Sequence, residues 1–237
     1  MSDTSIDWTD KVWNPTTGCT KGCAYCYARQ QALMHQRHPN EKIAHTYRNG
    51  FAPTCHPGRL AIPLHWRKPA RVFVDSMGDL FDPRIPEEFI CAVLGIIALT
   101  PHITYQVLTK NPRRMHAIIS RTSHGECVAE AVSQCGDEAR AFSRRMGPGW
   151  PWPLPNLWLG VSVEDQKTAN ERVPVLLRIP AVVHFISAEP LHGPLKLQKC
   201  WTCKGPDIEG CFCEVESYSS LRWVIAGGES GPKAKSP

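Results

Sequence analysis

Three cysteines close to the N-terminus have the types and the spacing of a metal-cluster site. Cys19, Cys23 and Cys26 form a C-x3-C-x2-C pattern within the segment GCTKGCAYCYA. So many thiolates in so short a stretch converge only if the backbone wraps around a bound group, and Gly18 and Gly22 give the backbone that freedom. Cysteine thiolates hold iron–sulfur clusters, and a four-iron cluster usually takes four of them. Three local cysteines would leave one iron open to a substrate or cofactor, as redox catalysis requires.

A structural zinc ion is the alternative for this first cysteine group. Its fourth ligand would be Cys55, His35 or His38. Structural zinc sites usually combine two cysteine pairs, and no second pair lies nearby in the sequence. The spacing therefore favours an iron–sulfur cluster over zinc.

A second group of cysteines lies near the C-terminus, in the segment CWTCKGPDIEGCFC. Cys200 and Cys203 have the spacing of a zinc knuckle, and Cys211 and Cys213 follow as a tighter pair. We expect a structural zinc ion here, with free thiols or an auxiliary iron–sulfur cluster as alternatives. The segment 200–213 then forms a small inserted knuckle.

The elements that must position these groups alternate between strand and helix. Continuous apolar or β-branched runs predict strands over 71–75, 103–108, 157–163, 182–187 and 223–226, with a weaker candidate over 12–17. Helical patterns cover 27–36, 86–99, 112–121, 126–146 and 165–177. This alternation predicts an α/β fold with a mostly parallel sheet. Six strands suit a partial barrel at least as well as a doubly wound sheet.

Polar side chains follow most of the predicted strands. They are Ser76 and Asp79 after the first strong strand, then Lys110, Ser162 with Glu164, and Glu189. Functional groups of parallel α/β barrels gather at the carboxyl ends of the strands, so we expect these side chains to line one cavity. Each carboxylate could equally cap the helix that follows its strand, and Lys110 could be a solvated loop charge.

Six segments together resemble a known family. They are IDWTDKVWNPTTGCTKGCAYCYA, VFVDSMGDLFD, YQVLTKNP, LWLGVSVEDQ, ISAEPL and WVIAGGESG. They are similar, in the same order, to a phage and bacterial family of unknown function named after phage gene products thirty-seven and sixty-eight. That family is grouped with the radical S-adenosylmethionine (SAM) superfamily, whose cysteine signature the first group also resembles.

The resemblance implies a partial (β/α)6 TIM-like barrel, with the cluster on the loop after the first strand. It implies that Cys19, Cys23 and Cys26 ligate three irons of a 4Fe-4S cluster and that SAM chelates the fourth. It places Tyr25 near the adenine, and it makes Ser76 and Asp79 candidates for the SAM amine. Ser162 and Glu164 are the corresponding candidates for the ribose, and Glu189 is a further candidate for cofactor binding.

The composition of the chain is that of a globular protein and does not indicate a particular binding partner. The chain has 237 residues, 42% of them apolar, and 27 Lys+Arg against 22 Asp+Glu give a net charge of +5. These values are typical of a globular chain with a core and do not by themselves demand nucleic acid. The longest apolar run, 90–99, is too short to span a bilayer, and we expect no targeting signal. We therefore expect a cytoplasmic protein with no membrane partner, in which eleven cysteines serve metal binding or catalysis rather than disulfides.

The sequence thus predicts one partial-barrel domain over 1–237, with a short tail at 231–237 and without a closing C-terminal helix. Its predicted function is that of a radical SAM enzyme, which needs SAM and an electron donor and acts on an unknown substrate. The alternatives are a non-catalytic, zinc-stabilised module that binds nucleic acid or protein, and a truncated inactive copy of the enzyme. Basic pairs such as Arg113–Arg114 and the tryptophans Trp150 and Trp152 leave a nucleic-acid substrate open.

Overall fold

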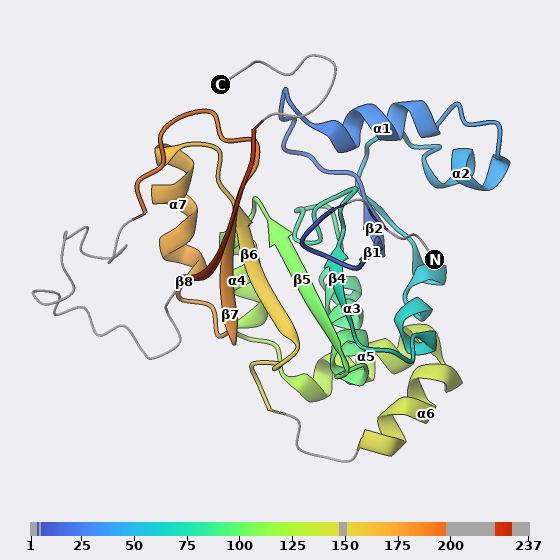
Figure 1. Ribbon diagram of the computed structural model, residues 1–237. Coiled ribbons are helices and arrows are strands. Elements are labelled where there is room, and N and C mark those ends of the chain that lie inside the picture. Colours follow the sequence, from blue (N-terminus) through green and yellow to red (C-terminus); the bar gives the residue numbers. More distant parts are fainter. Residues whose placement is uncertain (1–3, 5, 147–150, 198–220, 229–237) are drawn as a thin grey trace, which may run out of the picture.

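A sheet of six parallel strands forms the centre of the computed structural model, which describes residues 4, 6–146, 151–197 and 221–228 (Figure 1). The strands are β1 (Lys11–Trp13), β4 (Ala70–Val74), β5 (Ile103–Thr109), β6 (Leu157–Ser162), β7 (Val183–Ala188) and β8 (Leu221–Ala226). Each strand pairs in parallel with the strand before it, in the order β1-β4-β5-β6-β7-β8. All six carboxyl ends therefore lie at one edge of the sheet.

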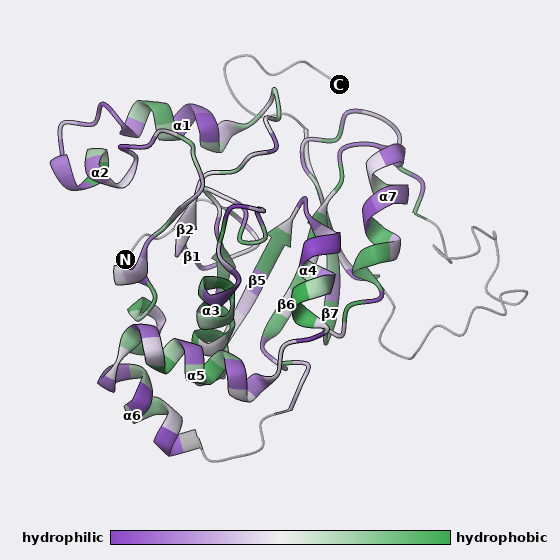
Figure 2. Ribbon diagram, turned by 180° about the vertical axis from the view of Figure 1, so that it is seen from behind, coloured by the Kyte–Doolittle hydropathy of each residue, from purple (hydrophilic) through white to green (hydrophobic). Residues whose placement is uncertain are grey.

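The helices that connect these strands cover one face of the sheet. They are α3 (Glu87–Leu99), α4 (Pro112–Ile119), α5 (His124–Cys135), α6 (Asp137–Met146) and α7 (Gln166–Leu176). Crossovers between neighbouring parallel strands are right-handed, so a sheet in sequential order carries its helices on the same face. Figure 2 shows α3, α4 and α7 in front of the sheet, with α5 outside α3. The apolar helix α3 is buried along almost its whole length because it lies between the sheet and α5.

Aromatic side chains fill the opposite face and show that the sheet is strongly curved. The Trp8 ring lies 4.7 Å from the ring of Phe73 on β4 and 5.6 Å from the ring of Trp223 on β8. Three strands separate β4 from β8, which would put them about 19 Å apart in a flat sheet. Because one tryptophan contacts both, the sheet must curl around Trp8. This curvature is compatible with a partial barrel.

The segment between β1 and β4 carries the smaller elements. A two-stranded antiparallel sheet pairs β2 (Thr16–Thr17) with β3 (Thr54–Cys55), and between them lie α1 (Tyr27–His35) and α2 (Glu41–Thr46). Two short 3-10 helices, Pro57–Arg59 and Ile62–His65, lead into β4. Figure 1 shows α1 above the carboxyl-end edge of the sheet, with α2 beyond it to the right.

Most of the predicted elements are present, and the main differences concern one strand and two helices. The predicted strand 12–17 is two strands, β1 and β2, in different sheets. The predicted helix 126–146 divides into α5 and α6 at Gly136, which has a φ of +63°. The helix α2 was not predicted. The α/β class and the parallel sheet are confirmed, whereas the predicted knuckle 200–213 and tail 231–237 lie outside the described residues.

No helix within the described ranges is long and apolar enough to cross a membrane.

Candidate functional site

The three N-terminal cysteines line one cavity at the carboxyl end of the sheet. Cys19, Cys23 and Cys26 border a space of about 350 Å³. Its remaining walls come from the cysteine loop, from α1 and from the segment before β3: Thr20, Lys21, Gly22, Arg29, Leu33, Phe51 and Ala52. The sequence pattern alone did not establish that the thiols share a cavity.

Gly18 makes the entry to the cysteine loop tight enough to form this cavity. Its φ is +86°, and a Cβ atom at this position would lie 2.4 Å from the carbonyl oxygen of Ala52. Its N–H donates to the Met77 carbonyl at 2.9 Å, and Gly18 also forms a parallel bridge with Gly78. The loop is thereby attached to the segment that follows β4.

Three buried aspartates in the segment after β4 fix the surrounding loops. Asp75 accepts hydrogen bonds from the Thr16 N–H at 2.9 Å and pairs with the Thr16 hydroxyl at 2.6 Å. Asp82 accepts from both the N–H and the hydroxyl of Thr20, each at 2.7 Å. Thr16 and Thr20 flank Cys19, so these two carboxylates hold the chain on either side of the first cysteine.

Asp79 fixes the end of β5 instead. Its carboxylate accepts four hydrogen bonds, from the Thr109 hydroxyl, the Asn111 side-chain amide and the N–H groups of Phe81 and Lys110. Two oxygens offer about four lone-pair positions, so these contacts occupy the carboxylate fully. Asp79 thus determines the backbone conformation at Lys110.

Each cysteine thiol accepts a hydrogen bond from a different donor. Cys26 caps the N-terminus of α1 and accepts from the Arg29 N–H at 3.4 Å. Cys23 lies 3.5 Å from the Lys110 ammonium group. Cys19 accepts from the Lys21 N–H at 3.3 Å, yet burial raises the pKa of its thiol to about 12. A bound metal cluster would have to displace this proton.

Lys110 connects the cysteine loop to the strands beyond it. Its Nζ lies 2.7 Å from the Tyr25 hydroxyl and 2.7 Å from Glu164 Oε1, and it lies 4.6 Å from the centre of the Tyr25 ring. Burial, and then the Glu164 carboxylate, raise the pKa of the Tyr25 hydroxyl above its ordinary value. Lys110 therefore brings Cys23, Tyr25 and Glu164 into one network.

Arg172 on α7 is the second cation of this network. Its Nη1 donates to Glu164 Oε2 at 2.9 Å and to the Ser162 carbonyl at 2.7 Å. Although burial alone would raise the pKa of the Glu164 carboxyl, the hydrogen bonds and charges of Lys110 and Arg172 lower it overall. Glu164 is therefore ionised between two cations.

The other predicted site residues lie around this network at different depths. Ser162 is buried and faces Ser187 across the β6–β7 pairing. The Ser76 hydroxyl donates to Asn14 Oδ1 at 3.2 Å, while its carbonyl accepts from the Tyr27 hydroxyl at 2.5 Å. Glu189 is exposed, and its carboxylate lies against Gly227 after β8.

Two members of the site were missed in the sequence. Arg172 lies on α7, the helix that follows β6, and a charged residue within a helical pattern usually indicates a solvent-exposed face. His192 follows β7; its ring centre lies 4.9 Å from that of Tyr25, with the two rings tilted, and its backbone N–H donates to the Glu164 carbonyl at 2.8 Å. Its position just after a strand end was the one signal that could have identified it.

The described residues contain no group of three or more His, Cys, Asp or Glu side chains close enough to hold a single metal ion. In a four-iron cluster each cysteine binds a different iron, so three thiols bordering one cavity suit a cluster without meeting at a point. The four cysteines predicted to bind zinc, Cys200, Cys203, Cys211 and Cys213, lie outside the described residues.

Comparisons with known proteins identify a family and nothing further. No curated protein and no solved structure matches the chain. The model of the family described as "Protein of unknown function (DUF5131)" matches residues 3–237. The chain therefore belongs to the DUF5131 family.

Proposed function

We propose that this protein is a radical SAM enzyme. The observation that carries the proposal is the C-x3-C-x2-C triad, Cys19, Cys23 and Cys26, bordering one cavity at the carboxyl end of a parallel sheet. When bound, a reduced 4Fe-4S cluster and SAM supply a 5′-deoxyadenosyl radical that abstracts hydrogen from a substrate. An external electron donor must provide the reducing electron.

The donor set around the cavity suits an anionic cluster. The Cys26 thiol lies at the N-terminus of a helix, where the backbone dipole favours negative charge. Lys110 places an ammonium group beside Cys23, and Lys21 and Arg29 add positive charge to the walls. Burying three negatively charged thiolates without compensating charge is unfavourable, and these cations would offset that cost.

The neighbouring network supplies the contacts that a cofactor with amino, carboxylate, ribose and adenine groups needs. Tyr25 offers an aromatic ring, and Lys110 joins it to Cys23 and to Glu164, the first ribose candidate. Ser162, the second ribose candidate, is linked to Glu164 through Arg172, which donates to both. Ser76 and Glu189 are the remaining contacts that we propose. Because its carboxylate is already fully hydrogen-bonded, Asp79 acts through Lys110, whose position it fixes.

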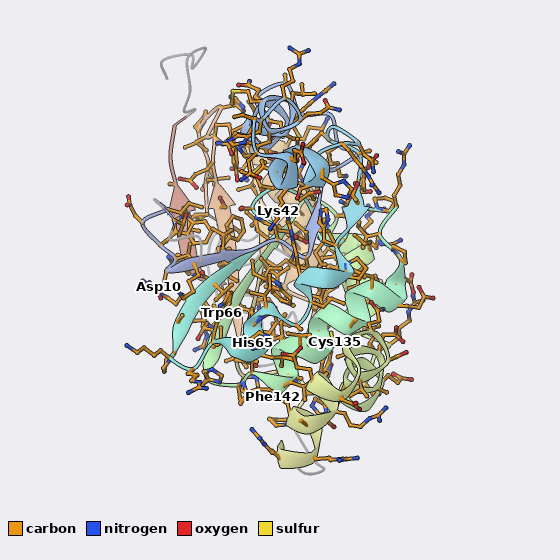
Figure 3. The ribbon with its side chains drawn as sticks, turned by 90° about the vertical axis from the view of Figure 1, so that its right-hand side faces the viewer. Asp10, Lys42, His65, Trp66, Cys135 and Phe142 are labelled. Carbon is orange, nitrogen blue, oxygen red and sulfur yellow. The ribbon has the colours of Figure 1, made fainter. Side chains whose placement is uncertain are left out.

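Anaerobic reconstitution with iron and sulfide tests the proposal. The full-length protein should become brown, contain iron with sulfide and, after reduction, cleave SAM to 5′-deoxyadenosine. Replacing Cys19, Cys23 or Cys26 by Ala should abolish both the colour and the cleavage. Cys135→Ala is the matched control, because Cys135 is the last residue of α5 and does not line the cysteine cavity; Figure 3 shows it below Lys42 of α2.

Two results would contradict the proposal. One is a colourless protein that retains zinc alone, which would favour the zinc-stabilised binding module. The other is a cluster that assembles as well as in the wild type when one of the three cysteines is replaced by Ala.

A further inference from the structure

A second cavity lies beside the two-stranded sheet and shares no lining residue with the cysteine cavity. It measures about 430 Å³. One wall comes from the end of α2 and the turn after it, and the other comes from β3 and the first 3-10 helix. The lining residues are His45, Thr46, Arg48, Asn49, Thr54, Cys55, His56, Pro57, Gly58 and Arg59.

The segment that builds this cavity carries most of the net charge of the protein. Residues 27–59 contain five Lys or Arg residues (Arg29, Arg37, Lys42, Arg48 and Arg59) and one acidic residue, Glu41, so 5 − 1 gives +4 of the total of +5. None of the described residues that line the cavity is acidic. A concave site walled by one sign of charge concentrates ligands of the opposite sign.

Arg59 contributes a half-buried positive charge that has no carboxylate partner among the described residues. Its guanidinium donates to the Asn14 carbonyl at 3.1 Å and to the Thr46 hydroxyl at 3.0 Å, both neutral oxygens. Burial lowers the pKa of this guanidinium from its ordinary value. The buried Asp75 carboxyl forms no salt bridge with it, and burial raises the pKa of that carboxyl to about 8.

Arg48 supplies a second, exposed guanidinium to the same cavity. Its Nη1 contacts His45 Nε2 at 3.3 Å, and neither Arg48 nor Arg59 forms a salt bridge within the described part of the chain. His56 is a neutral hydrogen-bonding group at pH 7, since burial and the charge of Arg59 lower its pKa to about 4. The cavity thus combines two guanidinium groups with imidazole, hydroxyl and amide side chains.

We infer that this cavity binds a phosphate group carried by a nucleotide or a nucleic acid. Guanidinium groups match phosphate oxygens in pairs, and two of them with no competing acid favour a multiply charged anion over a single carboxylate. The inference goes beyond radical SAM chemistry and requires no bound cluster. It assigns the protein a phosphate-bearing ligand held next to the cysteine loop, since the Thr17 hydroxyl joins His56 to the strand that leads to Cys19.

Binding of three phosphate probes to the full-length protein tests this inference. Inorganic phosphate and AMP are titrated by calorimetry, and a short fluorescein-labelled single-stranded oligonucleotide is titrated by fluorescence anisotropy. Arg48→Gln should weaken binding about tenfold, the loss expected when one charge-assisted contact is removed. Arg37→Gln is the matched control, because Arg37 is exposed on the same segment, carries the same charge and does not line the cavity; it should change affinity less than about twofold.

The probes also distinguish the source of the phosphate. Loss of AMP binding in Arg48→Gln supports a nucleotide, whereas loss confined to the oligonucleotide supports a nucleic acid. The inference is wrong if no probe binds, or if Arg37→Gln weakens binding as much as Arg48→Gln does. Because both metal-free and reconstituted protein are titrated, failure here is separate from failure of cluster assembly.

Discussion

The aspartates in the segment after β4 show which contacts of a side chain can be predicted from its residue type and which cannot. The resemblance makes Asp79 a candidate for the SAM amine, which stays a prediction, and in the fold its oxygens accept four internal hydrogen bonds. Asp75 and Asp82, in the same segment, hold the residues on either side of Cys19. Sequence could place a carboxylate at this edge of the sheet, but only the fold determines which neighbours reach it.

Asp75 has an unusual backbone and a raised pKa, and these make its substitutions predictable. Its φ is +58°, a region that Asn and Asp tolerate far better than Ala does. Burial raises its pKa to about 8, so the neutral carboxyl is the form that folding favours. Asp75→Asn should therefore fold with nearly wild-type stability, whereas Asp75→Ala should lose about 2–4 kcal/mol from backbone strain and an unsatisfied Thr16 N–H.

The pH dependence of this effect has a definite sign. A carboxyl whose pKa is higher in the folded protein stabilises it fully below the unfolded pKa of about 3.9, and that contribution is lost as the pH rises to about 8. Urea unfolding at pH 5 and pH 9 should show that Asp75→Asn gains stability relative to the wild type at the higher pH. An unchanged difference between the two proteins would show that Asp75 is ionised throughout.

Glu164 gives a second prediction at this scale, because it is a buried anion between two cations. Glu164→Gln removes the charge that compensates Lys110 and Arg172, and we expect a loss of about 3 kcal/mol in the free energy of unfolding. Glu87→Gln is the control: its partner Arg121 is exposed, so its loss should stay below about 1 kcal/mol. Equal losses in the two variants, measured by urea unfolding at pH 7, would contradict the buried network.

At the scale of elements, apolar runs predicted the strands well because both faces of the sheet are covered. The runs at 103–108 and 157–163 coincide with β5 and β6 within one residue. The helix α2 was missed because six residues with one strong apolar side chain give no periodic signal. The predicted helix 126–146 is two helices because Gly136, with its left-handed backbone, ends α5. The sequence did not show this, since a single Gly within a helical pattern is often tolerated.

The packing of α3 on α5 depends on a single glycine. A Cβ atom at Gly95 would lie 2.1 Å from the Cys127 carbonyl oxygen, which is rigid helix backbone. Gly95→Ala should therefore force the helices apart and lower the free energy of unfolding by about 1–3 kcal/mol, even though alanine favours helix. Gly125→Ala is the control in α5, where a Cβ atom would meet nothing within 4 Å; it should be neutral or stabilising. Thermal unfolding compares them, and a stabilised Gly95→Ala would contradict this packing.

At the scale of the whole molecule, strand order follows chain order, so the α/β class and the parallel pairing could be predicted from alternation alone. The curvature of the sheet could not. It depends on the contact of Trp8 with Trp223, two residues at opposite ends of the sequence, and no local pattern encodes such a contact. The convergence of Lys110, Glu164 and Arg172 beside Cys23 is a product of the same packing, because it joins the cysteine loop after β1 to the loop after β5 and to the β6–α7 unit.

Trp8 is the residue through which this curvature can be tested. Its ring contacts Phe73 and Trp223, and its carbonyl accepts a hydrogen bond from the Gln106 amide at 3.3 Å. Trp8→Ala should lower the free energy of unfolding by about 2 kcal/mol, less than for a fully buried tryptophan because Trp8 is partly exposed. Trp8→Phe, which keeps an aromatic ring, should recover most of this loss.

The effect of Trp8→Ala should also be uneven across the sheet. Among the described strands β8 pairs with β7 alone, so β8 depends most on the aromatic contacts of its inner face. Hydrogen exchange should therefore accelerate in Leu221–Ala226 well before it does in β5, which is paired on both sides. Uniform acceleration in both strands would mean that Trp8 contributes only to global stability, and that the sheet keeps its curvature without it.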